Sequence, residues 1–323
     1  MTDFEQLVEP HRARLRLHCY RMLGSSCDAD DMVQETLVRA FRSRATLHDP
    51  SLVRPWLYRI ATNVCLDELS RRPRRALGPE LGPPYDQDKP PPAPTPDVEW
   101  IEPCPSSWLV AEDATVQYTS KESVALAFVA VLQVLTPAQR AVLLLRDVVG
   151  LTAHETAIAL ESSVSAVNSA LHRARTALET HVGPSAGSRP SSAAPVDRAL
   201  LQQYLSAWES GDFGAVVALL HTEATFSMPP VPAWFAGRAA IARFFENMFC
   251  PTLQARTFRL RPVEANARDA AAFYRAGEDG RAHLFAIQLI AAREGQIVTV
   301  EHMMAQSALV AFRNSGLPMT VEL

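Results

Sequence analysis

The chain has 323 residues and carries 31 Lys and Arg against 35 Asp and Glu, a formal net charge of -4. This length allows several domains, and the charge balance excludes a protein that holds nucleic acid by bulk positive charge alone. The five cysteines lack short paired spacings, which excludes a zinc ribbon or disulfide framework and fits a reducing, cytoplasmic setting. With neither an 18-residue apolar span nor a Gly-rich phosphate loop, we expect no membrane partner, metal or cofactor.

Residues 25–44, "SSCDADDMVQETLVRAFRSR", predict an amphipathic helix near the start of the chain. Its apolar residues share one face: Val33, Leu37, Ala40 and Phe41. Three polar residues lie on another face: Asp31, Gln34 and Glu35. A polar stripe of this kind is ordinarily solvated, so by itself it names no partner.

A second helix is predicted in "RPWLYRIATNVCLDELSRRPRR", residues 54–75, which combines aromatic rings with arginines. Rings can stack on bases and arginines can follow backbone phosphates. The candidates for nucleic-acid contact are Arg54, Trp56, Tyr58, Arg59, Arg71 and Arg72. Trp56, Ile60 and Val64 also have helical spacing, so a core position for Trp56 remains the alternative.

Residues 79–120 contain eight acidic residues and one basic residue, together with a run of prolines. Such a composition favours extended polyproline II over helix and predicts a linker. Thirty residues of this kind span roughly 90 Å at about 3.1 Å each. Val98, Trp100 and Ile101 interrupt the polar run and indicate a docking point.

Capping signals divide the next helical stretch. "TPAQ", starting at Thr136, predicts a capping box with proline in the first turn, and Gly150 ends this run. Thr152 and Glu155 repeat the capping box before a short helix. The tight turn "ESS" leads into a second helix whose N-cap is Ser163, so the pair predicts a helix-turn-helix.

The second of these helices, within residues 162–179, has one apolar stripe, which we expect to be buried: Val167, Leu171, Ala174 and Leu178. In a helix-turn-helix such a helix enters the major groove and meets base edges with its N-terminal residues. Ser165, Asn168 and Ser169 suit base edges, and the candidates for phosphate contact are His172, Arg173 and Arg175. An ordinary helical hairpin with a solvated face is the alternative.

These segments resemble the extracytoplasmic-function type of the sigma-70 family. The resemblance is strongest in "LTPAQRAVLLLRDVVGLTAHETAIAL", part of region 4, which covers residues 121–180. "DADDMVQETLVRAF" resembles region 2.2, and residues 54–75 resemble regions 2.3 and 2.4. Many family members have Lys and Arg where this chain has Asn168 and Ala170, so its contacts with DNA should be less charged.

The resemblance assigns partners to the candidate residues. It implies that Asp31, Gln34 and Glu35 grip the clamp helices of core RNA polymerase. The candidates in residues 54–72 would melt and read the −10 promoter element, and those in residues 165–175 would read the −35 element. Family linkers thread through polymerase toward the RNA exit path, where an acidic strand could mimic RNA or act merely as a spacer. Because polymerase and both elements hold a sigma factor together, a weakly charged chain suffices.

Residues 183–195 are rich in small residues and predict a second hinge. Residues 196–323 then predict helices in 196–221 and 237–249, followed by four strands in 257–265, 269–276, 283–293 and 296–305. Helices followed by successive antiparallel strands indicate an α+β domain, and the pattern resembles the SnoaL-like cone-shaped domains. His302 and His283 are candidate acid/base residues of a possible small-ligand pocket, although a lone histidine is more often structural.

The sequence therefore predicts a multi-domain protein, in which two all-α domains are joined by an acidic proline-rich linker and followed by an α+β SnoaL-like domain. The predicted parts are region 2 (1–78), linker (79–120), region 4 (121–182), hinge (183–195) and SnoaL-like domain (196–323). The predicted function is a non-enzymatic RNA polymerase sigma factor regulated by its C-terminal domain. A helix-turn-helix regulator and a cyclase-like enzyme with a DNA tether are the alternatives.

Overall fold

The computed structural model of the protein describes residues 3–72, 74–87, 92–94, 98–109, 125–182, 196–249 and 258–323. The chain divides into two compact units. The first consists of Met1–Arg75 with Trp108–Arg189, and the second of Ala76–Ser107 with Pro190–Leu323. The predicted hinge, residues 183–195, lies outside the described residues.

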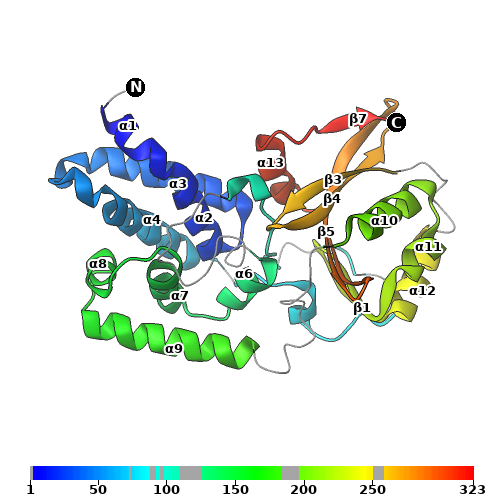
Figure 1. The fold of residues 1–323 in the computed structure, drawn as a ribbon, viewed down its shortest axis with the longest axis horizontal. Helices are drawn as coiled ribbons and strands as arrows, with labels where there is room; N and C mark the ends of the chain where they lie inside the picture. Colours follow the sequence, from blue (N-terminus) through cyan, green and yellow to red (C-terminus); the bar gives the residue numbers. More distant parts are fainter. Residues whose placement is uncertain are drawn as a thin grey trace. The chain divides into compact units, whose positions relative to one another are not determined.

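The N-terminal part of the first unit is helical (Figure 1). Its α-helices are α1 (Asp3–Val8), α2 (Arg12–Leu23), α3 (Ser26–Arg42) and α4 (Val53–Leu69). Single 3-10 turns join them: η1 (Glu9–His11), η2 (Arg44–Thr46) and η3 (Pro50–Leu52). Gly24 ends α2 at a φ of 71°, which glycine adopts without strain, and the Ser25 hydroxyl caps α3 by accepting from the Asp28 amide at 3.0 Å.

The remaining helices of the first unit are α6 (Leu126–Leu132), α7 (Pro137–Leu143), a π-helical turn η6 (Leu144–Val148), α8 (Ala153–Ala159) and α9 (Val164–Val182). Both predicted capping boxes are present. Thr136 and Gln139 exchange hydrogen bonds at the start of α7, and Thr152 and Glu155 do the same at α8. The capping-box residues therefore predicted correctly where α7 and α8 begin.

The predicted apolar stripe of α9 is buried, and Ala174, its most enclosed residue, is 0% exposed. The stripe predicted on α3 is only partly correct. Val33 and Ala40 are buried, whereas Phe41 is 50% exposed and packs edge-on against Phe4 at 5.6 Å. Phe41 follows Ala40 directly, so the two side chains point about 100° apart and only one can face the core.

The second unit contains helices α10 (Arg198–Ser210), α11 (Phe213–Ala218), α12 (Arg238–Phe249) and α13 (Gln306–Asn314). Its strands are β1 (Leu220–Met228), β2 (Val231–Ala236), β3 (Phe258–Ala265), β4 (Arg268–Ala276), β5 (Arg281–Arg293), β6 (Gln296–Met303) and β7 (Thr320–Glu322). They form one sheet in the order β2-β1-β6-β5-β4-β3, with β7 paired to β5.

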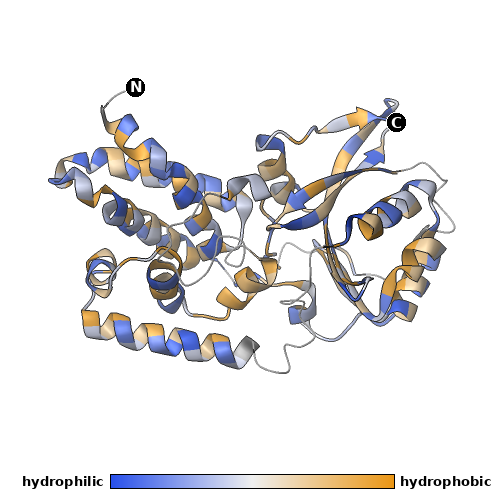
Figure 2. Cartoon of the chain, in the orientation of Figure 1, coloured by the Kyte–Doolittle hydropathy of each residue, from blue (hydrophilic) through white to orange (hydrophobic). Residues whose placement is uncertain are grey.

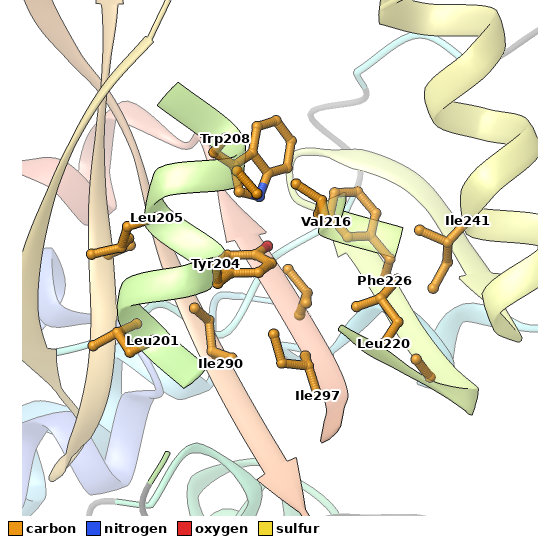
Figure 3. Close-up of a cluster of buried hydrophobic side chains, with 14 of the residues drawn as sticks. Leu201, Tyr204, Leu205, Trp208, Val216, Leu220, Phe226, Ile241, Ile290 and Ile297 are labelled. Atoms are coloured by element: carbon orange, nitrogen blue, oxygen red, sulfur yellow. The ribbon is translucent and has the colours of Figure 1, made fainter. Parts of the chain in front are cut away.

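The four predicted strands are present, but the sheet is mixed because β1 pairs parallel with β6. The sequence analysis missed β1, β2, β7 and α13. One face of the sheet holds an aromatic core under α10, α11 and α12, centred on Trp208 and Phe226 (Figure 3). The Trp208 ring contacts Phe245 at 5.4 Å and Phe273 at 5.2 Å. Edge-to-face packing of this kind favours a fixed arrangement of rings.

The linker departs from the expectation of a free extended strand. Its described residues from Ala76 to Ser107 belong to the second unit, where they include the 3-10 turn η4 (Gly78–Leu81). Trp100 and Ile101, predicted as a docking point, are buried. A further 3-10 turn, η5 (Ser106–Trp108), follows. The proline-rich composition indicated that this segment would be extended. It could not indicate that the segment would pack with the domain formed by residues 190–323.

Candidate nucleic-acid interface

Helix α9 presents the residues predicted for the −35 element on its open face. Ser163 caps the helix by accepting from the Ala166 amide at 3.1 Å. The buried stripe of α9 packs toward α7 and α8, and polar residues occupy most of its exposed positions (Figure 2). All six predicted residues are exposed: Ser165, Asn168, Ser169, His172, Arg173 and Arg175. The six residues predicted for the −35 element thus lie together on the exposed side of one helix.

Arg175 differs from the other five because it is engaged inside the unit. Its guanidinium binds the Asp147 carboxylate through two hydrogen bonds of 2.9 and 2.6 Å. The Asp147 side chain is 5% exposed, whereas that of Arg175 is 44% exposed. Arg175 thus neutralises a buried acid on the π-helical turn, and its contact with phosphate stays a prediction.

The arginines of α4 predicted for the −10 element contact the helix-turn-helix part of the same unit. Arg54 donates to the backbone carbonyl of Val149, which precedes α8. Arg59 forms an ion pair with Glu161, in the turn between α8 and α9. These two arginines are therefore occupied by oxygen atoms of the chain itself.

The two aromatic candidates of α4 have different environments. Trp56 is half-buried and donates from its indole nitrogen to the Thr46 hydroxyl at 3.2 Å. Tyr58 is 4% exposed and packs edge-on against His18 at 5.2 Å. Burial raises the pKa of Tyr58. Tyr58 is thus a core residue in this conformation, and Trp56 is the one of the two with an accessible ring.

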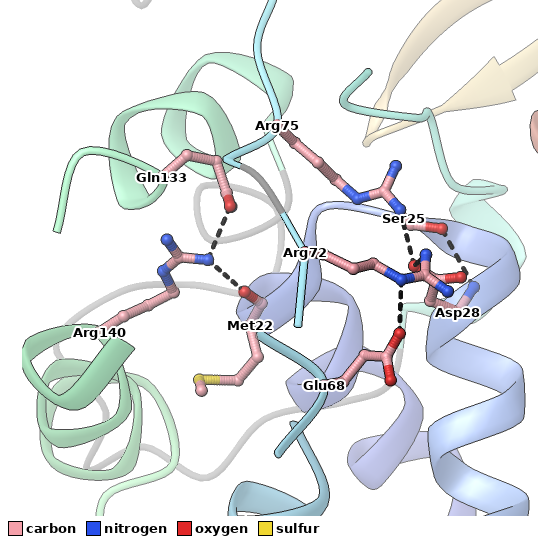
Figure 4. Close-up of polar contacts among 8 residues, drawn as sticks. All are labelled: Met22, Ser25, Asp28, Glu68, Arg72, Arg75, Gln133 and Arg140. Carbon is pink, nitrogen blue, oxygen red and sulfur yellow. Dashed lines mark hydrogen bonds and ion pairs between the residues drawn. The ribbon is translucent and has the colours of Figure 1, made fainter. Parts of the chain in front are cut away.

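Arg71 and Arg72 follow the end of α4 and are both exposed. Arg72 donates to Asp28 at 2.8 Å and pairs with Glu68 at 2.5 Å, while Arg75 binds the same Asp28 oxygen at 2.7 Å (Figure 4). Asp28 therefore fixes the end of region 2 through two arginines. Sequence reasoning did not select Asp28, whose only signal was its first-turn position in α3.

Arg140 of α7 was also missed. It is 3% exposed and donates to the backbone carbonyl of Met22, at the end of α2, and to the Gln133 amide oxygen at 2.6 Å (Figure 4). Burial lowers the pKa of Arg140 to about 10, so it remains charged at neutral pH. This buried cation joins the two helical parts of the unit.

The residues predicted to contact polymerase line a groove between α3 and α4 of about 460 Å³. Its polar lining includes Asp31, Gln34, Glu35, Arg39, Asp67 and Arg71. Arg39 bridges the two helices by pairing with Glu35 at 2.7 Å and Asp67 at 3.0 Å. The structure thus brings the three predicted residues together on one accessible surface.

The two candidate histidines of the second unit, His302 and His283, differ in environment. His302 is 7% exposed beside the rings of Phe226 and Phe273, and its Nδ1 accepts from the Gln288 amide at 3.1 Å. Burial lowers the pKa of His302 to about 4, so its ring is neutral at pH 7. His283 is exposed and pairs with Asp279 at 2.9 Å. Among the residues that the structure describes, no three His, Cys, Asp or Glu side chains lie close enough together to hold a metal ion.

Three family descriptions match the chain in the order that the sequence predicts. Sigma-70 region 2 matches residues 7–75, Sigma-70 region 4 matches residues 125–178, and the SnoaL-like domain matches residues 201–300. A protein of Mycobacterium tuberculosis, the ECF RNA polymerase sigma factor SigG, is 41% identical over 98% of this chain and 84% of its own length.

The chain belongs to the ECF RNA polymerase sigma factors. The predicted family is thereby confirmed, and with it the predicted sigma-factor function: the protein directs promoter-specific initiation with core RNA polymerase. The ECF sigma factor SigE of Mycolicibacterium smegmatis is 31% identical over 56% of this chain and 62% of its own length.

A solved ECF sigma factor shares the fold. The crystal structure of SigJ from Mycobacterium tuberculosis matches 94% of this chain and 97% of its own, with a TM-score of 0.57 and 23% identity. Within the described parts of this sigma factor, no helix is both long and apolar enough to cross a bilayer.

Proposed function

We propose that this sigma factor recognises the −35 element with the exposed face of α9 and binds core polymerase with the groove between α3 and α4. The observation that carries the first assignment is the free N-terminal face of a capped recognition helix. Ser165, Asn168 and Ser169 are exposed there, on the side opposite the buried stripe. Hydroxyl and amide groups at these positions can read base edges, and Arg173 can bind phosphate.

The −10 assignment rests on the remaining candidates of α4 and the residues after it. Trp56, Arg71 and Arg72 are accessible, while Arg54 and Arg59 must exchange their intramolecular partners for phosphate. A phosphate oxygen can replace either a carbonyl or a carboxylate at a guanidinium. We therefore assign Arg54 and Arg59 to a conformation in which region 4 has moved away from α4.

The polymerase assignment is tested with the double variant Gln34→Ala and Glu35→Ala. Both side chains lie on the accessible side of α3, so the fold should survive the change. Competition with a labelled reference sigma factor for purified core polymerase should show at least tenfold weaker binding. Glu179→Ala, an exposed acidic change on α9, is the control for lost charge. Unchanged competition by the double variant contradicts the assignment.

The C-terminal domain is proposed to regulate the sigma factor without chemical turnover. His302, the buried candidate, bonds to an amide rather than a carboxylate and is surrounded by phenylalanines. Its lowered pKa keeps it neutral, and a neutral buried imidazole without an acidic partner is a weak acid/base.

A further inference from the structure

Helix α9 begins with an exposed valine. Val164 is its first helical residue, directly after the N-cap Ser163, and is 40% exposed. The next large apolar side chains of the helix, Val167 and Leu171, are at most 7% exposed. Val164 lies three residues before Val167 and seven before Leu171, so it continues the apolar stripe past the end that the unit buries.

The position of Val164 places its side chain at the end of α9 that meets DNA in a helix-turn-helix. The Cα–Cβ bonds of an α-helix tilt toward its N-terminus, so a side chain in the first turn reaches toward the helix end. In this motif the N-terminal residues of the second helix contact base edges in the major groove. Val164 also precedes Asn168 by four residues, which makes the two side chains neighbours on the helix surface. Val164 thus lies beside a residue that we assign to a base edge.

The first turn of α9 has a composition that suits close approach to DNA. It consists of Val164, Ser165 and Ala166, all of which are uncharged and exposed. By contrast, α8 has Glu155 in its first turn, where a carboxylate stabilises the positive end of the helix dipole. A carboxylate at the start of α9 would be repelled by the phosphates on both sides of the groove. The uncharged start of α9 thus allows a contact that an acidic start would oppose.

An apolar side chain in the major groove selects one base. Guanine, cytosine and adenine present hydrogen-bond donors and acceptors there, whereas thymine also presents its C5-methyl group. A valine against a polar edge removes water from donors and acceptors without replacing the hydrogen bonds, which costs free energy. The same valine against the methyl group buries apolar surface on both partners. A valine at the start of the recognition helix therefore favours thymine.

We propose that Val164 is a specificity-determining residue of the −35 contact and packs against the C5-methyl group of a thymine. The proposal rests on the assignment of α9 to the −35 element and adds the base that its first turn selects. Val164 and Asn168 are separated by about 6 Å along the helix axis, and successive base pairs by about 3.4 Å. The thymine therefore lies within about two base pairs of the base that Asn168 contacts.

The test removes the methyl group from the thymine and the methyl groups from the valine. A −35 sequence is first selected from a randomised promoter library with the full chain and core polymerase. Each thymine of that element, on either strand, is then replaced by deoxyuridine, which lacks only the C5-methyl group. At one thymine the replacement should weaken binding of the sigma–polymerase complex about fourfold, the ratio that corresponds to one methyl group no longer buried. With Val164→Ala the same replacement should change binding less than about 1.5-fold.

A matched control separates this contact from a general loss of apolar surface. Val164→Ala replaces an exposed valine by a better helix former, so α9 should keep its structure. Ile158→Ala removes an exposed apolar side chain from α8, the other helix of the motif, where Ile158 is 54% exposed. The Ile158 variant should retain the full fourfold effect of deoxyuridine, because its side chain lies outside the recognition helix.

Two results overturn the inference. One is a deoxyuridine effect of equal size in wild type and Val164→Ala. The other is a selected element in which no thymine within about two base pairs of the Asn168 position responds to deoxyuridine. Asn168→Ala, assayed with the same library, tests the underlying assignment separately. If it alters the −35 preference while Val164→Ala leaves the deoxyuridine effect intact, only the valine contact is wrong, whereas unaltered recognition in both variants removes α9 from the −35 element.

Discussion

The recognition helix α9 and helix α4 were assigned to DNA by the same kind of sequence pattern, but they present their polar residues differently. The first residues of α9 face outward, while Arg54 and Arg59 of α4 bind a carbonyl and a carboxylate of the same unit. A guanidinium group that can bind a phosphate can also bind a carbonyl or carboxylate oxygen that the fold places beside it. In our assignment, α9 is therefore ready to bind DNA, whereas α4 must first release the oxygen atoms that occupy Arg54 and Arg59.

The largest expected effect concerns the buried arginine that joins the two helical parts. Arg140→Met leaves the Met22 carbonyl and the Gln133 oxygen without their charged donor and should destabilise the unit by about 2 to 4 kcal/mol. Hydrogen exchange of α7 amides measures this loss locally. Arg42→Met, at an exposed helical position, is the control and should stay within about 0.5 kcal/mol of wild type. Equal effects of the two changes would show that Arg140 does not fix region 4 to α2.

The readiness of α9 is tested by Asn168→Ala. The change should alter discrimination at one position of the −35 element by about 1 to 3 kcal/mol, because a base edge loses its hydrogen bonds. A promoter library transcribed with core polymerase measures the preference. Arg173→Ala is the matched comparison and should weaken all promoters alike. Arg175 is unsuitable for this purpose since its removal also uncovers the buried Asp147. Unaltered −35 preferences in the Asn168 variant would contradict the placement of α9.

The second unit provides a pH test that involves no DNA. Burial lowers the pKa of His302 to about 4 from its ordinary value near 6.5. Between these pH values the unfolded chain binds a proton at His302 that the folded domain does not, so the His302 contribution to stability falls as the pH falls, by about 2 kcal/mol from pH 7 to pH 5. Burial raises the pKa of the adjacent Glu301 to about 7, and its contribution has the opposite sign over this range. His302→Gln should therefore shift the pH dependence of thermal unfolding toward greater stability at pH 5 relative to wild type, and His283→Gln, at an exposed site, should leave it unchanged.

The smallest expected effect is at the occupied arginine. The Glu161 and Arg59 side chains are 69% and 41% exposed, so their pair contributes less than about 1 kcal/mol. Glu161→Gln should therefore strengthen binding of a −10 oligonucleotide by the sigma–polymerase complex at most a few-fold, and less at high salt. Glu179→Gln removes the same charge from an exposed position on α9 and should change little. A gain of equal size in both variants would indicate net charge as the cause.

Much of the fold followed from local signals in the sequence. The capping residues Ser25, Thr136, Thr152 and Ser163 act within one turn, so the starts of their helices were readable without the rest of the molecule. The three residues that we propose to contact polymerase were likewise contained in the spacing of one helix, α3. What could not be read depended on partners distant in sequence. Tyr58 is buried by α2, and Asp147 and Arg175 meet only because a π-helical turn places the acid beneath α9.

The C-terminal domain shows the same limit. The alternation of strands β3 to β6 was visible, whereas β1 and β2 were missed because neither shows a clean two-residue period: Phe226 and Ser227 are both buried in β1, and the adjacent Trp234 and Phe235 of β2 are both aromatic. The parallel pairing of β1 with β6 joins segments about 70 residues apart, which no local pattern encodes. For the linker, the apolar residues Trp100 and Ile101 correctly predicted a docking point but not the surface that receives it.

The position of the linker in the chain has a consequence for how the protein is made. Residues 76–107, which belong to the second unit, leave the ribosome before any residue of its sheet, and β1 cannot pair until β6 has been synthesised. At roughly 5 to 20 residues per second, about 200 further residues take roughly 10 to 40 s. Region 2 and region 4 are complete during that interval, while the sheet of the second unit does not yet exist. Each newly translated molecule therefore passes through a period in which its linker residues lack the domain that they later join.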